Sequence, residues 1–369
     1  MFEFDADNLI YNRFDLIYDN VNVERFSYND NGVTYAIDAH YENNRAVINT
    51  WGKRFPQRIY ESVIDDIFDQ HPEIRCIEMT RTGNDYKHLL NEINDIRVPV
   101  PKTVEELLQR LKGKHQYTLK RIKRIMNEKY GPLAITVYGS DIPDALVNLY
   151  FEWKFITHGT DYAMSPKEYL IKYYVTNAIM IKAGNENVGV AFFCIVENIA
   201  YLENFSYNSK LNNLSPGYLT YELLLEELVK RRCLYLYLGG GEYSYKKRFG
   251  AEVSLAYSGT VYSPSVFEKL NSYFKNHNIN RIAVYGVGAG GQEFMKLANC
   301  LAVEITYCID KDKNKKEIDN LPIYSLEDKF EDVDAVIITL KTHNKEVENF
   351  IESKFKMFFY WKDLVNGNF

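Results

Sequence analysis

Residues Leu214 to Glu252 read LSPGYLTYELLLEELVKRRCLYLYLGGGEYSYKKRFGAE and combine a loop, a helix, a strand and an aromatic-basic turn. Pro216 and Gly217 mark the start of the helix, because proline suits a first helical position. Its apolar stripe has helical spacing and consists of Tyr221, Leu224, Leu225 and Leu228. A short strand at 234–238 follows and ends in three glycines. The unpaired N–H groups at the helix start predict an anion site in the loop before it.

Composition limits the classes of function open to this chain of 369 residues. The length predicts two or three domains, and 46% apolar residues suffice for a sizeable core. The net charge of −6 argues against a general nucleic-acid binder, so no DNA partner is expected. The first residues lack the features of a signal peptide, and no apolar run approaches the ~18 residues of a transmembrane helix. We expect a cytoplasmic protein whose five cysteines, which include no C-x-x-C pair, stay reduced.

The region before about residue 130 reads as a mixed α/β unit followed by a basic helix. Residues 33–40 and 45–51 resemble paired strands, 58–70 a helix, and 74–79 a further strand. A capping-box pattern, Thr103 to Glu106, opens a helix, and seven lysines and arginines then lie between Lys112 and Lys129. Two interpretations stay open: a solvated helix face, or a positive wall for a phosphate-bearing ligand. The histidines His40, His71 and His88 are too scattered for a metal site, and no metal is expected.

The residues from about 133 to 262 alternate between strands and helices. A strand at 133–138 precedes helices at 141–157 and 165–174. Three antiparallel strands are separated by short polar turns and occupy 177–183, 187–196 and 199–207. Alternation along the last of these predicts that Tyr201, Glu203, Phe205 and Tyr207 share one face. The stretch from Leu214 follows, and a final strand or hairpin at 253–262 leads into a linker helix at 263–274.

This order of elements resembles the GNAT acyltransferase fold, although the loop N-N-L-S-P-G departs from that fold's usual Q/R-x-x-G-x-G/A pattern. A closer resemblance is to CelD/BcsL-type and FemAB-like proteins. It rests on the basic helix, S-P-G, L-x-L-G-G and Y-K-x-x-F-G, the last of which comprises Tyr245, Lys246, Phe249 and Gly250. The resemblance implies an α/β fold with two GNAT-like lobes: a degenerate lobe at 1–130 and an acyltransferase domain at 131–262.

The last part of the chain, 263–369, reads as a separate small domain. A strand at Arg281–Tyr285 runs into a glycine-rich turn, and the next strand ends at Asp310, about 20 residues further on. This spacing predicts a nucleotide site in which Gly286 and Gly288 admit a diphosphate. Gly291 would let helix and strand pack closely, and Asp310 would accept a ribose hydroxyl. The pattern resembles the Rossmann-like, nucleotide-sugar-binding domain of PglD-type sugar acetyltransferases; the alternative is a degenerate unit that only packs.

Acyl transfer from a thioester needs a bound acyl donor, groups that polarise the thioester carbonyl, and a general base that takes the proton of the nucleophile. The predicted site for acetyl-CoA, or another acyl-CoA, consists of Leu214, Ser215, Gly217 and Tyr218. Glu203 is the candidate base, and a structural ion pair is its alternative role. Tyr243 or Tyr245 is the candidate donor of a proton to the leaving thiolate. The FemAB-like resemblance implies that Lys246 neutralises a substrate phosphate.

Three functions are compatible with these features. The first is an acyl-CoA-dependent N- or O-acyltransferase that acts on a nucleotide-linked amino sugar in surface polysaccharide biosynthesis. The second is a FemAB-like aminoacyl-tRNA-dependent transferase, whose basic helix would contact tRNA. The third is a non-catalytic dinucleotide-binding protein. The first is favoured because the tail ends without a domain for hydride transfer, so a nucleotide-sugar suits it better than a redox cofactor.

Overall fold

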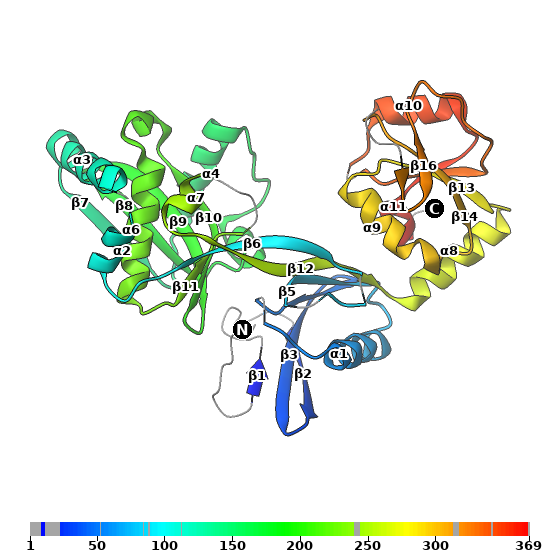
Figure 1. Cartoon of the computed structure of the whole chain (residues 1–369), viewed down its shortest axis with the longest axis horizontal. Coiled ribbons are helices and arrows are strands. Elements are labelled where there is room, and N and C mark those ends of the chain that lie inside the picture. Colours follow the sequence, from blue (N-terminus) through cyan, green and yellow to red (C-terminus); the bar gives the residue numbers. More distant parts are fainter. Residues whose placement is uncertain are drawn as a thin grey trace. The chain divides into compact units, whose positions relative to one another are not determined.

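The structure is a computed structural model that describes residues 9–11, 23–51, 53–83, 85–87, 89–111, 113–239, 244–312, 317–340 and 342–367. These residues form two compact units (Figure 1). Unit 1 takes its described residues from 9–11, 23–92 and 257–367, and unit 2 takes them from 93–256. The stretch from Leu214 to Glu252 therefore lies in unit 2.

Unit 2 is built on a mixed sheet whose strands follow the order β12-β6-β11-β10-β9-β8-β7. Neighbouring strands from β7 to β10 are antiparallel, whereas β10 and β11 are parallel because α6 connects them. The strands are β6 (Asn91–Pro99), β7 (Leu133–Tyr138), β8 (Asn177–Ala183), β9 (Glu186–Val196), β10 (Ile199–Tyr207), β11 (Tyr235–Tyr237) and β12 (Glu252–Tyr262).

Helices cover both faces of this sheet (Figure 1). One face carries α2 (Val104–Arg110), α3 (Gly113–Tyr130) and α6 (Pro216–Lys230), and the other carries α4 (Asp144–His158) and α5 (Pro166–Lys172). A 3-10 turn, η2 (Ser209–Leu214), precedes α6, and the short helix α7 (Ser244–Arg248) precedes β12. Gly189 on β9 lets α6 approach the sheet, because a Cβ there would overlap the hydroxyl of Thr220.

The basic helix α3 docks onto α6 through one of its lysines. Lys123 Nζ lies 2.8 Å from Glu222 Oε1 and 2.9 Å from Glu226 Oε1. Burial raises the pKa of Glu222 to about 7, although the Lys123 charge opposes the shift. Burial lowers the pKa of Lys123, but the two glutamates outweigh it and the net shift is upward. The other described cations of the helix, Lys114, Lys120, Arg121, Arg124 and Lys129, are exposed.

Replacing Glu222 by glutamine is expected to change the pH dependence of stability. The folded-state pKa of Glu222 lies above its ordinary value, so its stabilising contribution is present below about pH 4.5 and is lost as the pH rises through 7. The wild type should therefore lose on the order of 2 kcal/mol relative to Glu222→Gln between pH 4.5 and pH 8. Urea unfolding at both pH values measures this, with Glu226→Gln as the control. Parallel pH profiles for wild type and Glu222→Gln would contradict the assignment.

The N-terminal part of unit 1 contains a second mixed sheet. Its strand β3 is antiparallel to β2 and β4, and β4 is parallel to β5, to which α1 connects it. One apolar stripe of α1 packs on this sheet and includes Ile59, Val63 and Ile67. β12 pairs with β5 in the antiparallel direction. The elements are β1 (Leu9–Tyr11), β2 (Val23–Asp30), β3 (Val33–Glu42), β4 (Arg45–Asn49), α1 (Gln57–Gln70) and β5 (Cys76–Thr82).

The C-terminal part of unit 1 holds a six-stranded sheet in the order β15-β16-β14-β13-β17-β18, in which all neighbours except β15 and β16 are parallel. Helices α8, α9 and α11 cover one face and α10 covers the other. The strands are β13 (Arg281–Tyr285), β14 (Glu304–Ile309), β15 (Glu317–Ile318), β16 (Leu321–Tyr324), β17 (Ala335–Ile338) and β18 (Phe358–Tyr360). The helices are α8 (Pro264–Asn276), α9 (Ala289–Leu297), η3 (Ala298–Cys300), α10 (Lys345–Lys354) and α11 (Trp361–Asn366).

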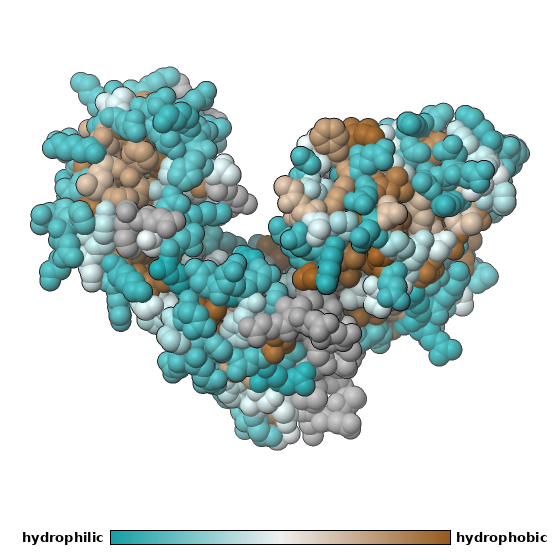
Figure 2. Space-filling view, turned by 180° about the vertical axis from the view of Figure 1, so that it is seen from behind, coloured by the Kyte–Doolittle hydropathy of each residue, from teal (hydrophilic) through white to brown (hydrophobic). Residues whose placement is uncertain are grey.

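Most of the elements expected from the sequence are confirmed within a few residues, including 133–138, 177–183, 199–207 and 281–285. The predictions did not include β2, β6, β15, β16, β18, α7 or α11. The basic helix, expected within the N-terminal lobe at 1–130, packs instead with α6 in unit 2. In Figure 2 hydrophilic residues cover much of the visible face, and hydrophobic patches lie between them.

Candidate active site

The strand β10 is paired with β11 only at its start. The two strands are paired over Ile199–Tyr201 and Tyr235–Tyr237, and the stacked rings of Tyr201 and Tyr237 lie 5.1 Å apart at the end of the pairing. The strand β11 is paired with β6 over its whole length, and this pairing continues to the Leu238 N–H, which donates to the Ile96 carbonyl at 2.7 Å. β10 itself runs on to Tyr207. Residues 202–207 of β10 therefore extend beyond the pairing with β11 and lead through η2 to the start of α6.

A bulge in β10 lies just beyond the pairing with β11. Leu202 pairs with Phe193 of β9 and Asn204 pairs with the next residue, Phe192, so Glu203 is the extra residue. Leu202 faces the helices α3 and α6, whereas the Asn204 side chain accepts a hydrogen bond of 3.0 Å from Tyr150 on α4. The bulge thus turns Asn204 to the α4–α5 face.

The expectation that Tyr201, Glu203, Phe205 and Tyr207 share one face is therefore wrong. After the bulge, Phe205 packs against the core below α6, and the Tyr207 ring lies against Gly217 at the start of α6. The charge of Glu203 contributes to the raised pKa of Tyr169 on α5, after the larger effect of burial. The physical reason is the inserted residue, which reverses the alternation of every side chain after it.

An aromatic cluster surrounds the bulge on the α4–α5 face. The Tyr150 hydroxyl lies 3.0 Å from the Tyr162 hydroxyl, and the Tyr162 ring stacks on Phe151 at 4.6 Å. Tyr169 and Phe192 complete the cluster, each with its ring centroid 5.3 Å from that of Tyr150. Burial raises the pKa of Tyr150, so its hydroxyl stays protonated and can donate to Asn204. Glu203 and Asn204 thus border an aromatic surface with several hydroxyl groups.

The predicted acyl-CoA residues lie together where η2 passes into α6. Leu214 is buried, and Ser215 has the left-handed backbone conformation at φ 47° that turns the chain into the helix. The N–H groups of Tyr218 and Leu219 donate to the Ser215 carbonyl, and Pro216 has no N–H. Any Cβ at Gly217 would come within 2.7 Å of the Tyr207 ring. Burial raises the pKa of Tyr218, whose ring packs on Phe249. Binding of a diphosphate at these residues stays a prediction.

The Y-K-x-x-F-G element forms α7 and the turn after it. Lys246 is buried, and its ammonium group donates to the carbonyls of Leu238 and Gly239 at 3.1 and 3.2 Å. Burial lowers its pKa, against the attraction of Asp95. In this arrangement Lys246 anchors the end of β11, and a role toward a substrate phosphate stays a prediction. Tyr243 and the side chain of Tyr245 lie outside the described residues, so their predicted role is likewise untested.

The glycine turn of the C-terminal sheet has the compact geometry that its sequence predicts. Gly286 has φ +92°, and a Cβ at Gly291 would overlap the Gly286 carbonyl. Gly288 is exposed at the start of α9, with no atom within 4 Å of a Cβ placed there. The Asp310 carboxylate accepts the N–H groups of Val287 and Asp312, each at 2.9 Å. Asp310 therefore holds the turn in shape, and its predicted contact with a ribose remains untested.

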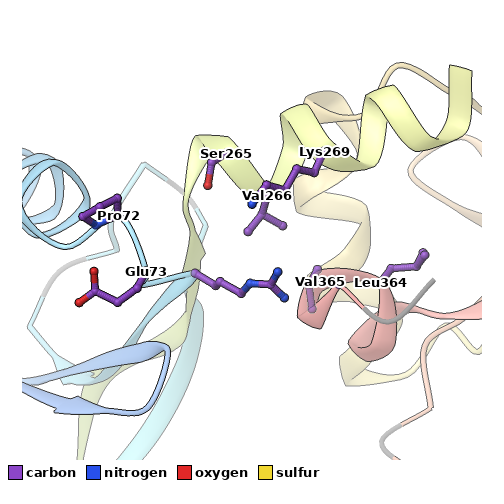
Figure 3. A pocket seen from close by; sticks show the side chains of 9 residues that line it. Pro72, Glu73, Ser265, Val266, Lys269, Leu364 and Val365 are labelled. Atoms are coloured by element: carbon purple, nitrogen blue, oxygen red, sulfur yellow. The ribbon is translucent and has the colours of Figure 1, made fainter. Parts of the chain in front are cut away.

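Two cavities among the described residues lie elsewhere. One, of about 120 Å³, is shown in Figure 3 and is lined by residues such as Glu73, Arg75 and Lys269. The other, of about 290 Å³, is lined by residues that include His343, Tyr360 and Asp363. Neither contains a predicted site residue. In the described parts of the chain there is no cluster of metal-ligating side chains, and no helix is long and apolar enough to cross a membrane.

Comparison with known protein families identifies the central segment. Residues 176–247, from β8 to the middle of α7, match the family described as acetyltransferase (GNAT) domain. The match covers less than half of the chain. The matched segment contains the bulge in β10, the helix α6 and the strand β11, so the mixed α/β fold and the acyltransferase activity expected from the sequence are confirmed. No curated protein matches the sequence significantly.

Several solved structures resemble the arrangement of the chain at low sequence identity. FemX has a TM-score of 0.46 and 8% identity, over 65% of this chain and 88% of its own. L-PGS from Bacillus licheniformis has a TM-score of 0.42 and 12% identity, over 64% and 83%. A tandem GNAT protein from the clavulanic acid biosynthesis pathway has a TM-score of 0.39 and 8% identity, over 66% and 83%. At these values the likeness does not extend to a substrate.

The predictions from the sequence did not include the side chains next to the bulge in β10. Tyr150 and Asn204 were absent from the predicted site, although their hydrogen bond joins α4 to the bulge. The spacing of tyrosines on α4 and α5 was the available signal, but the chain contains 30 tyrosines and the cluster did not stand out.

Proposed function

We propose that the protein transfers an acyl group, most simply acetyl, from acyl-CoA to the amine or hydroxyl of a nucleotide-linked sugar in surface polysaccharide biosynthesis. The observation that carries the proposal is the meeting of three features at the carboxyl end of β10. These are the end of the pairing with β11, the bulge at Glu203 and the start of α6 at Gly217. The acyl-CoA supplies a thioester, and the chain supplies its binding surface and a base.

In the proposed reaction the acceptor nitrogen or oxygen attacks the thioester carbonyl. A C–N or C–O bond forms, the C–S bond breaks, and the acceptor loses a proton. Glu203 takes this proton, directly or through a water, and Tyr245 returns a proton to the departing thiolate. Main-chain N–H groups of β10 after the bulge polarise the carbonyl oxygen. Glu203 suits its role because it lies next to the tyrosine cluster, beyond the end of the pairing with β11.

We further propose that the N-terminal sheet is a degenerate GNAT-like lobe, as in CelD/BcsL-type and FemAB-like proteins. The support is a repeated unit: β4, α1 and β5 form a parallel strand–helix–strand unit, as do β10, α6 and β11. The repeated unit supports the proposal of two separate lobes within the division at 1–130, 131–262 and 263–369. Packing of α3 with α6 favours a boundary for unit 2 near residue 93 instead of 130.

The C-terminal sheet is proposed to be a Rossmann-like domain that binds the nucleotide part of the acceptor. Its parallel strands run in the order β16-β14-β13-β17-β18, and the glycine turn follows the central strand β13. Ligands of such sheets bind at the carboxyl ends of the strands, near this point. Gly286, Gly288 and Gly291 would receive the diphosphate. A covalently linked site of this kind would raise the local concentration of acceptor for the GNAT domain.

One observation favours the tRNA-dependent alternative. Five cations of α3 are exposed and make no ion pair with α6, which suits a phosphate backbone. The net charge of −6 argues against it. A third possibility, a dinucleotide-binding protein without activity, would use only the glycine turn. Calorimetry with acetyl-CoA, UDP-sugars, NAD and aminoacyl-tRNA distinguishes the three, because each alternative binds a different donor or ligand.

Replacing Gly217 by aspartate tests the donor site. The new Cβ would displace the Tyr207 ring, and the carboxylate would repel a diphosphate at the start of α6. We expect acetyl-CoA to bind roughly 10-fold more weakly, by calorimetry. Lys210→Asp is the control, since Lys210 is an exposed residue of η2. Equal acetyl-CoA affinity in Gly217→Asp and wild type would show that the donor binds elsewhere.

A further inference from the structure

Lys154 on α4 is a partly buried cation that has no partner of opposite charge among the residues the structure describes. Its side chain is half-buried, and Nζ lies 5.6 Å from the ring centroid of Tyr150. Burial lowers the pKa of Lys154, and no carboxylate of the described residues lies within ion-pair distance of it. A desolvated ammonium group costs free energy unless an anion or hydrogen-bond acceptors compensate it.

Other partly buried lysines in unit 2 have such compensation. Lys123 lies between two glutamates, and Lys246 donates to two main-chain carbonyls. Lys172 on α5 also lies over a tyrosine ring, at 5.8 Å from that of Tyr173, but it is exposed. Lys154 thus differs from Lys123 and Lys246 in lacking a partner, and from Lys172 in being partly desolvated.

The position of Lys154 connects it to the reaction centre. It lies one helical turn after Tyr150, whose ring it covers. The hydroxyl of Tyr150 binds Asn204, which follows Glu203 in the bulge. Lys154 therefore belongs to the α4–α5 surface that borders the proposed base, on the opposite face of the sheet from the start of α6.

We propose that Lys154 binds an anionic group of the acceptor, a phosphate or a carboxylate, and so orients the acceptor nucleophile toward Glu203. An ammonium group recognises either anion as a point charge, and the aromatic surface beside it limits competition from water. In a nucleotide-linked sugar, the phosphate next to the sugar is such a group. This inference rests on the proposed acyltransferase function and narrows its acceptor to the anionic class.

Paired acceptors that differ in one charge test the proposal. For the phosphate, acetyl transfer to glucosamine 1-phosphate is compared with transfer to methyl glucosaminide, since both lack a nucleoside. For the carboxylate, β-alanine is compared with its amide. We expect the wild type to favour the charged member of one pair by roughly 10-fold or more in kcat/KM, mainly through KM. Lys154→Met should lose this preference without change toward the neutral member, and Lys154→Arg should keep part of it. Lys172→Met is the matched control and should behave as wild type.

Calorimetric titration with acetyl-CoA distinguishes a failure of the proposed role of Lys154 from a failure of the proposed acyl donor. Acetyl-CoA binding that is normal in all variants, together with equal rates for charged and neutral acceptors in the wild type, would overturn the role of Lys154 alone. The same holds if Lys154→Met keeps the full preference. Failure of the wild type to bind acetyl-CoA would overturn both the role of Lys154 and the proposed donor. Thermal unfolding shows whether each variant is folded. If Lys154→Met does not fold, the preference for charged acceptors is measured with Lys154→Arg instead.

Discussion

Replacing Glu203 by glutamine is expected to lower kcat for acyl transfer by roughly 10²- to 10³-fold, the range that a positioned base contributes. Glutamine keeps the size of the side chain and its hydrogen bonds but cannot take a proton from the acceptor. Glu203 is the inserted residue of the bulge in β10, beyond the part of this strand that is paired with β11. The KM for acyl-CoA should stay within a few-fold of wild type, because the donor site at the start of α6 is on the other face of the sheet.

A structural role for Glu203 would give a different result. If Glu203 holds α5 or the bulge in place, Glu203→Gln should lower the unfolding temperature, and activity should fall together with stability. Asn204→Asp is the matched variant, since it changes the neighbouring residue of the same bulge and perturbs the hydrogen bond to Tyr150. Initial rates with saturating acetyl-CoA, measured beside thermal unfolding, separate the two. Wild-type turnover in Glu203→Gln would remove Glu203 from the mechanism.

Elements whose periodicity is strong were predictable from the sequence. The stripe of α6 buries Tyr221, Leu224 and Leu228 as its spacing requires, and β8, β9 and β10 are the meander that the polar turns indicate. The elements that were missed have weak local patterns. In β6 a buried aspartate, Asp95, interrupts the apolar run, and β18 has only three residues. Tertiary contacts form these strands, so their segments carry no regular alternation of their own.

The candidate site was predictable in its parts but not in its geometry. Glu203 and Gly217 could be proposed together from the sequence because strand, loop and helix are consecutive in it, and their roles stay predictions. The bulge was not predictable, since Leu202-Glu203-Asn204 reads as ordinary alternation and the inserted residue shows only in the register with β9. The burial of Lys246 was missed for a similar reason: its basic neighbours suggest an exposed turn, yet its ammonium group meets two carbonyls that lie seven and eight residues earlier.

Replacing Gly288 by valine is expected to weaken binding of a nucleotide-linked sugar by roughly 100-fold, the loss of one or two hydrogen bonds to a charged group. Gly288 is the N-cap of α9, with extended backbone angles that valine adopts readily. A Cβ there meets no protein atom within 4 Å, so the fold should tolerate the change. The added methyl groups would stand where a diphosphate has to approach the start of α9.

Gly291→Ala is the contrasting variant of the same turn. A Cβ at Gly291 would overlap the carbonyl of Gly286, whose oxygen also accepts the Thr339 hydroxyl at 2.6 Å. The main chain has to move, so Gly291→Ala should destabilise the C-terminal sheet by about 1–3 kcal/mol. Calorimetry with a UDP-sugar and with NAD, beside thermal unfolding of both variants, measures the two effects. Gly288→Val should lose the ligand and keep the unfolding temperature, while acetyl-CoA affinity stays unchanged. Tight binding of NAD, without binding of UDP-sugars, would instead make the turn a dinucleotide site and leave the acceptor without its proposed anchor.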